Sequence, residues 1–168
     1  MKKIFCLLFV SVLFMTSAFA YTYPRWKSMP VHVYIPPNCG KYTKLMQKAF
    51  YAWEYKTGGI VKFKYVSKKS NSNIYVEFVN DITDCNSDAA VGCTHPITNG
   101  RYLASPCRIE IETGRSNNHL YGTMIHEVGH ALGLNHSSNS NSVMYPYDLD
   151  KMQQVTDVDL DLIKKKYR

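Results

Sequence analysis

The chain has 168 residues, of which 20% are charged and 45% hydrophobic, and its formal net charge is +7. This mild positive charge, much of it in the run Lys164–Lys166, comes without a basic stripe of interleaved aromatic residues, which argues against a nucleic-acid-binding protein. After the first 20 residues no stretch is apolar enough to span a bilayer, so we expect no stable membrane anchor.

The N-terminal segment has the pattern of a secretory signal peptide. Lys2 and Lys3 precede an apolar run over residues 4–15, and Ala18-Phe19-Ala20 supplies a small-residue cleavage site. The run is too short for a comfortable transmembrane helix. We therefore predict a signal peptide over 1–20 and one domain over 21–168, secreted or periplasmic, with a formal charge of +5.

The next four elements are predicted from hydrophobic periodicity. Residues 26–35 and 60–66 alternate apolar and polar side chains, as half-buried strands do, and 73–79 repeats the pattern. Between the first two strands, residues 41–57 carry an apolar stripe at helical spacing that Gly58 closes. The first half of the domain therefore has the order β-α-β-β.

The second half is less regular. We predict a short strand over 89–94, a turn through 96–100 and a strand over 108–112, which precedes a helix that carries the histidines. Thr156 is the predicted N-cap of a C-terminal helix, because Asp159 follows three residues later as in a capping box.

Cysteine usage fits an oxidising compartment. Cys6 belongs to the predicted signal peptide, and the remaining cysteines are Cys39, Cys85, Cys93 and Cys107. An even number in an exported domain predicts two disulfides, for which four cysteines allow three pairings. A thiolate metal site is disfavoured because the sequence contains no C-x-x-C pair.

The stretch 123–136 carries the predicted chemistry. His126 and His130 are four residues apart, so on a helix they lie about 40° apart around the axis and both face one metal ion. Glu127 lies about 100° away on the same turn, as a general base must to reach a metal-activated water. Gly133 ends the helix and returns the chain so that His136 becomes a third ligand.

Three imidazoles and a water make an open catalytic zinc site. The alternative is a set of surface histidines on an amphipathic helix, and a bare His-Glu-x-x-His does not exclude it. The longer pattern, with Gly133 and His136 in register, is far more specific and favours zinc.

The motif His126-Glu127-x-x-His130-x-x-Gly133-x-x-His136, followed by Ser142-Val143-Met144-Tyr145-Pro146, resembles the metzincin metalloproteases with their Met-turn. Ser137 after the third histidine, and Pro146 where other branches carry a zinc-binding tyrosine, make the chain most similar to the matrixins. The resemblance implies an α+β fold. Its parts are a five-stranded mixed twisted sheet with an antiparallel edge strand, two long helices, a Met-turn and a C-terminal helix.

The resemblance also implies a substrate cleft. The strand over 89–94, with Ala90, Val91 and Gly92, would be the sheet edge to which an extended peptide adds as another strand. Gly122, four residues before the first ligand, implies a deep specificity pocket, although a helix-packing glycine is an equal alternative. Pro146 and Tyr147 would form its wall, and Met144 a hydrophobic floor under the zinc. Asp159 matches a family aspartate that bonds the Met-turn backbone.

From the family's strand order, the resemblance implies the pairings Cys39–Cys85 and Cys93–Cys107, which would hold the irregular 80–107 stretch. Related enzymes bind a second zinc and calcium ions there. In the stretch 80–107 this chain has one histidine, His95, which follows Asp81, Asp84 and Asp88. Neither a second zinc nor a structural calcium ion is therefore predicted.

The resemblance implies a monomeric zinc endopeptidase acting on proteins or peptides, with one catalytic zinc and Glu127 as general base. One rival is a zinc amidase acting on cell-wall peptides, which only the cleft lining distinguishes. The other is a non-catalytic metal- or protein-binding module, which does not need Glu127.

Overall fold

In the computed structural model, the described residues are 24–85, 90–147, 150–151 and 153–168. The predicted signal peptide and Asp88 lie outside these ranges. No helix of the described part is long and apolar enough to cross a membrane.

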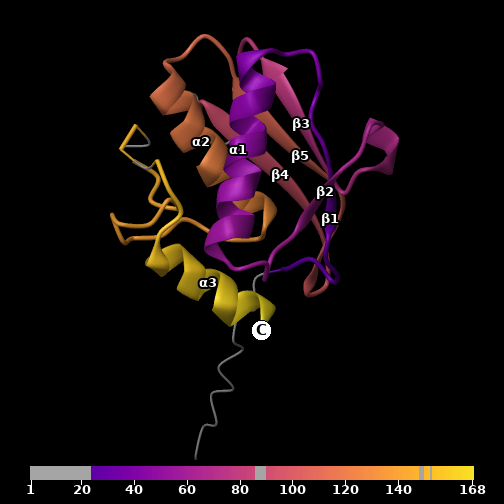
Figure 1. The fold of residues 1–168 in the computed structure, drawn as a ribbon, viewed down its shortest axis with the longest axis vertical. Helices are drawn as coiled ribbons and strands as arrows, with labels where there is room; N and C mark the ends of the chain where they lie inside the picture. The colour runs from indigo at the N-terminus through magenta and orange to yellow at the C-terminus, as the bar shows by residue number, and fades with distance from the viewer. Residues whose placement is uncertain (1–23, 86–89, 148–149, 152) are drawn as a thin grey trace, which may run out of the picture.

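One mixed sheet of five strands organises the fold, in the order β2-β1-β3-β5-β4 (Figure 1). The strands are β1 (Val31–Tyr34), β2 (Phe63–Tyr65), β3 (Ile74–Val79), β4 (Gly92–Asn99) and β5 (Tyr102–Glu112). β1, β2, β3 and β5 are parallel, whereas β4 runs antiparallel to β5 at the edge. The predicted five-stranded sheet with an antiparallel edge strand is confirmed.

Two long helices, α1 (Lys41–Lys56) and α2 (Asn117–Ala131), lie side by side over the sheet (Figure 1). The apolar stripe predicted for α1 is its buried face and contains Met46, Ala49, Phe50 and Trp53. The Trp53 indole donates a hydrogen bond of 2.9 Å to the Ile125 carbonyl in α2, which satisfies its polar atom inside the core. This packing fixes α2, the helix of the histidine motif.

The hairpin of β4 and β5 is longer than predicted. The turn expected through 96–100 is confined to Gly100 and Arg101, and β5 begins at Tyr102 instead of residue 108. Pro96 lies at a register shift between His95 and Ile97, on the edge strand, where a missing N–H breaks no inner ladder. Pro96 therefore marks a bulge and does not end the strand.

The predicted disulfide pairing is wrong. The bond joins Cys85 and Cys93, while Cys39 and Cys107 are free. Cys93 lies opposite Glu110 in the β4–β5 ladder, so their side chains share a face of the sheet. Cys107, three residues before Glu110, projects to the other face, into the core beneath the helices. The direction predicted for β4 is nevertheless correct.

The third helix, α3 (Asp157–Tyr167), lies at one end of the helical layer (Figure 1), and a short 3-10 turn, η1 (Lys69–Asn71), links β2 and β3. The predicted N-cap is confirmed: Thr156 and Asp159 form a reciprocal capping box. Asp159 is fully buried, which places its carboxylate inside the domain and not on its surface.

Candidate metal and catalytic site

Three imidazoles meet at the C-terminal part of α2. His126 and His130 come from the helix and His136 from the loop after it, and one ring nitrogen of each lies within 4.8 Å of the others. Gly133 makes the return with a φ of 84°, and a Cβ there would lie 1.9 Å from the Pro24 carbonyl oxygen. Only glycine tolerates both that backbone conformation and that contact.

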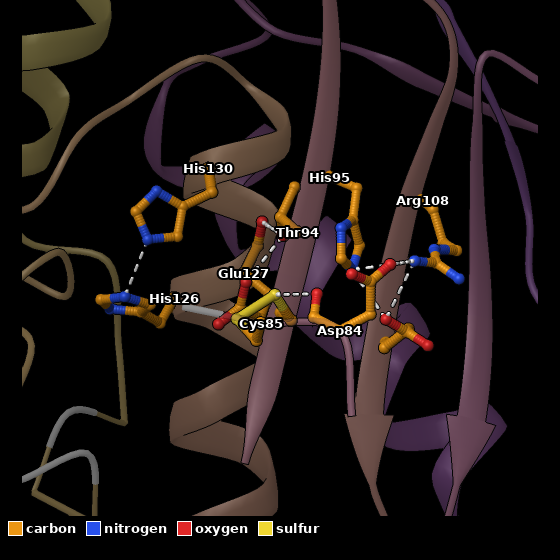
Figure 2. Close-up of a disulfide and its surroundings, with 10 residues drawn as sticks. Asp84, Cys85, Thr94, His95, Arg108, His126, Glu127 and His130 are labelled. Carbon is orange, nitrogen blue, oxygen red and sulfur yellow. Dashed lines mark hydrogen bonds and ion pairs between the residues drawn. A yellow bond between two sulfur atoms is a disulfide. The ribbon is translucent and has the colours of Figure 1, made fainter. Parts of the chain in front are cut away.

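The ring nitrogens fit a bound metal cation. His126 Nδ1 donates to the Val143 carbonyl at 2.7 Å and His130 Nδ1 to the Leu134 carbonyl at 2.8 Å. The two Nε2 atoms then face each other at 3.0 Å (Figure 2), and in neutral rings both carry a lone pair. Burial lowers the pKa of His126 to about 3 and also lowers that of His130, with the neighbouring imidazole a further cause for His126. Two facing lone pairs on neutral rings suit a cation between them.

A buried methionine packs against α2 between the two helical histidines. Met144 is fully buried, and a Cβ on Gly129 would lie 2.2 Å from its sulfur and 2.9 Å from Trp53 Cζ2. Gly129, between the two helical histidines, is therefore the position at which α2 lets Met144 and Trp53 approach its backbone. This role of Gly129 was not predicted, because the motif does not specify the two residues between Glu127 and His130.

Glu127 is buried, with 5% of its surface exposed, and points from α2 toward β4 (Figure 2). Its Oε2 accepts a hydrogen bond of 2.7 Å from the Thr94 hydroxyl, which also lies 3.0 Å from the Glu127 carbonyl oxygen. Burial raises the pKa of Glu127 to about 7, and the Thr94 hydrogen bond opposes that rise. A carboxyl group with a pKa near neutrality suits general acid–base chemistry.

The edge strand touches Glu127 at a second residue. A Cβ on Gly92 would lie 2.8 Å from both Cγ and Oε1 of Glu127, and 2.5 Å from Thr123 Cγ2. Gly92 and Thr94 are two apart, so both face α2 and hold the carboxylate from one side. Gly92 was among the predicted substrate-binding residues, whereas Thr94 was not. Because side chains alternate between the two faces of a strand, the position of Thr94 two residues after Gly92 was the signal that both lie on one face.

Asp159 connects α3 to the first histidine. Its carboxylate accepts hydrogen bonds from the Ser142 hydroxyl and, at 3.2 Å, from the Val143 N–H. The Val143 carbonyl in turn accepts from His126 Nδ1. The predicted contact between Asp159 and the backbone next to Met144 is confirmed. Through Val143 it reaches His126 Nδ1, and supporting groups at that ring nitrogen orient metal-binding histidines.

The other predicted substrate residues are dispersed. Ala90 and Val91 precede β4 and are half-buried, and Gly122 is buried within α2. Beyond Met144, Pro146 is half-buried and Tyr147 is 67% exposed. The specificity pocket predicted around Gly122 remains a prediction.

His95 lies next to Thr94 in β4 but on the opposite face of the sheet. Its Nε2 pairs with Glu110 Oε2 at 2.7 Å, and Arg108 bridges Asp84 at 3.0 Å and Glu110 at 3.4 Å (Figure 2). This network lies beside the Cys85–Cys93 disulfide and gives His95 a protein partner.

Comparison with known proteins defines the class. The profile of the matrixin family, a family of metalloproteases, matches residues 36–168, and the chain belongs to that family. It is 29% identical over 117 residues to a probable matrix metalloproteinase, 095L, of Invertebrate iridescent virus 3, a match that covers 62% of this chain and 31% of that protein.

Two other relatives match over shorter stretches, with a higher percentage of identical residues. Matrix metalloproteinase-A of Caenorhabditis elegans is 45% identical over 42 residues, covering 25% of this chain and 8% of the relative. Human matrix metalloproteinase-15 is 51% identical over 35 residues, covering 21% and 5%. The chain thus spans less than a third of the length of these curated relatives.

Proposed function

We propose that this chain is a secreted zinc-dependent endopeptidase that hydrolyses peptide bonds in extended protein substrates. The observation that carries the proposal is the buried Glu127 carboxylate on the same turn of α2 as His126, in a cluster completed by His130 and His136. The matrixin family membership and the names of the relatives support the same class of reaction.

The donor set is suited to zinc. Three neutral imidazole nitrogens with room for a further ligand are typical of catalytic zinc sites, and carboxylate-rich sites suit calcium or magnesium instead. When bound, a zinc ion supplies Lewis acidity to the scissile carbonyl and to the attacking water. The protein's contribution is to orient the His126 and His130 rings through hydrogen bonds to the Val143 and Leu134 carbonyls.

Glu127 is the proposed general base and acid. Its carboxylate takes a proton from the attacking water and delivers it to the leaving nitrogen, which departs as an amine. The Thr94 hydroxyl and the space left by Gly92 fix the carboxylate's position beside the histidines. A carboxylate that is already oriented avoids reorganisation during the reaction.

The open edge of β4 is the proposed binding surface for the peptide. The Val91 carbonyl accepts from the Glu112 N–H, so Val91 directs its polar groups toward β5. By the alternation of an antiparallel ladder, Gly92 and Thr94 direct their N–H and C=O groups toward the open edge. An extended peptide that pairs there as a sixth strand places its backbone next to Glu127.

Secretion through the predicted signal peptide and a monomeric state complete the proposal. The Cys85–Cys93 disulfide supports an oxidising compartment, where such bonds persist.

The test is to incubate the purified, zinc-loaded protein separately with an unfolded protein and with peptidoglycan, each with and without chelator. We expect chelator-sensitive cleavage of the unfolded protein at internal peptide bonds. Release of cell-wall peptides alone would establish the amidase. Zinc binding without hydrolysis of either material would establish the non-catalytic module.

A further inference from the structure

A basic pocket lies beside the histidine cluster. It has a volume of ≈ 570 Å³ and touches His136, the third histidine of the cluster. Its walls come from the segment before β1, the β4–β5 turn, the loop after α2, and α3. Of its described lining residues, four are cationic: Arg25, Arg101, Lys165 and Lys166. The volume is within the range of ordinary ligand sites.

The charge of the described lining residues is of one sign. Among them is no aspartate or glutamate, and the described residues include no ion pair to Arg25, Arg101 or Lys165. Burial lowers the pKa of Lys166 to about 8, and the positive charge of Arg25 adds to the effect. Several cations in a partly enclosed space make the local electrostatic potential positive, and an anionic group bound there would be stabilised by it.

Backbone contacts hold the cationic walls in place. The Arg25 N–H donates to the Arg101 carbonyl at 3.2 Å, and the Leu103 N–H donates to the Arg25 carbonyl at 2.9 Å, as in an added strand at the hairpin. The Lys166 ammonium donates to the Pro24 carbonyl at 3.3 Å. Together with the loop after α2, the pocket is thus built by four separate parts of the chain, and it is not a patch of surface lysines on one helix.

The pocket has a defined place along the proposed cleft. β4 runs from Gly92, beside Glu127, to Asn99, and Arg101 is in the turn that follows. A peptide that pairs antiparallel to β4 therefore carries the residues on the N-terminal side of its scissile bond toward this turn. The hydroxyls of Ser137 and Ser138, which also line the pocket, are suitable donors to a carboxylate.

We propose that this basic pocket is a subsite for an acidic side chain of the substrate, Asp or Glu, on the N-terminal side of the scissile bond. The proposal rests on the proposed endopeptidase function and adds a specificity to it. The carboxylate forms charge-assisted hydrogen bonds with Arg101 and Arg25 while the backbone pairs with β4. Discrimination against the uncharged amide follows because an amide does not neutralise the positive charges of Arg25 and Arg101.

The test compares fluorescent peptides that differ only by Glu or Gln at one of the second to seventh positions before the cleaved bond, the range that pairing with β4 carries from Thr94 toward Arg101. Binding is measured by anisotropy on the zinc-loaded Glu127→Gln protein, so that the readout does not need hydrolysis. We expect the Glu peptide to bind roughly three- to ten-fold more tightly, with a difference that shrinks at high salt. The kcat/KM of the wild-type protein should show the same preference.

Charge variants assign the preference to the pocket. Arg101→Gln with Lys165→Gln, both at exposed positions, should abolish it, whereas Lys44→Gln with Lys64→Gln changes the net charge equally at exposed positions on α1 and β2 and should leave it intact. Equal binding of the Glu and Gln peptides overturns the subsite, and so does a preference that survives in the pocket variant. Peptide binding without any hydrolysis by the wild type would instead contradict the endopeptidase function while the subsite stands.

Discussion

The Thr94 hydroxyl on the edge strand donates a 2.7 Å hydrogen bond to the Glu127 carboxylate on the active helix. The two residues are 33 positions apart in the chain, and the contact joins the strand that we propose binds substrate to the group that we propose moves the proton. Pairing of a peptide with β4 and placement of the base are therefore parts of one local structure.

Replacement of Thr94 by Val removes this donor and keeps the shape of the side chain. We expect kcat to fall about 10- to 100-fold with little change in KM, because a hydrogen bond to a charged group is worth about 1.5–3 kcal/mol. Steady-state kinetics on an internally quenched peptide measures both constants.

Thr94→Ser is the matched control, since it keeps the hydroxyl and should retain most of the activity. An equal loss in the Ser and Val variants would show that the methyl group, and not the hydrogen bond, matters at this position.

Gly92→Ala should disturb the same carboxylate by contact. The added Cβ would meet Thr123 and Glu127 well inside normal contact distance, so we expect about 1–3 kcal/mol lower stability and reduced kcat/KM. Denaturant unfolding and kinetics report the two effects. Thr98→Ala, at an exposed position of the same strand, should change neither. Wild-type behaviour of Gly92→Ala would mean that β4 and α2 are further apart than described.

Asp159→Asn tests the connection from α3 to His126. The carboxylate accepts hydrogen bonds from Ser142, Val143 and Thr156, and an amide cannot accept them all. We expect about 1–3 kcal/mol lower stability and zinc binding weakened by about 10-fold, as for other groups that support metal ligands.

Urea unfolding and competition with a fluorescent zinc chelator measure these changes. Asp161→Asn is the control, because Asp161 is an exposed residue of the same helix. If Asp159→Asn loses stability but binds zinc normally, Val143 does not transmit the effect to His126.

Among the four cysteines that the structure describes, non-reducing peptide mapping should recover one bond, Cys85–Cys93, and two thiols, Cys39 and Cys107. Burial raises the pKa of Cys107 to about 12, so its thiol should resist alkylation until the protein unfolds, while half-buried Cys39 reacts earlier. A Cys39–Cys85 peptide would contradict the structure of the segment before β4.

The sequence predicted features that are local or periodic. The His126–His136 motif is contiguous, the stripe of α1 repeats with the helical period, and Thr156 and Asp159 form a cap within one turn. The contact of Asp159 with the backbone near Met144 followed from the family resemblance and was confirmed.

Features that depend on register between distant segments were not predictable in the same way. Thr94 meets Glu127 only because β4 passes along α2, and the two faces of the hairpin, not the spacing of the cysteines, exclude Cys93–Cys107. Pro96 suggested a turn because proline usually interrupts a strand, and the sequence did not show that the edge strand continues through it with a register shift.

The most direct test of the account is a comparison of wild type with Glu127→Gln for zinc content and for hydrolysis of an unfolded protein. We predict about one zinc per molecule and native thermal stability in both proteins, with turnover in the variant lower by about 10³-fold or more, because it lacks the proposed base. Removal of zinc by a chelator should abolish wild-type turnover, and readdition should restore it. Near wild-type hydrolysis by Glu127→Gln, or hydrolysis that survives full removal of zinc, would contradict the proposed function.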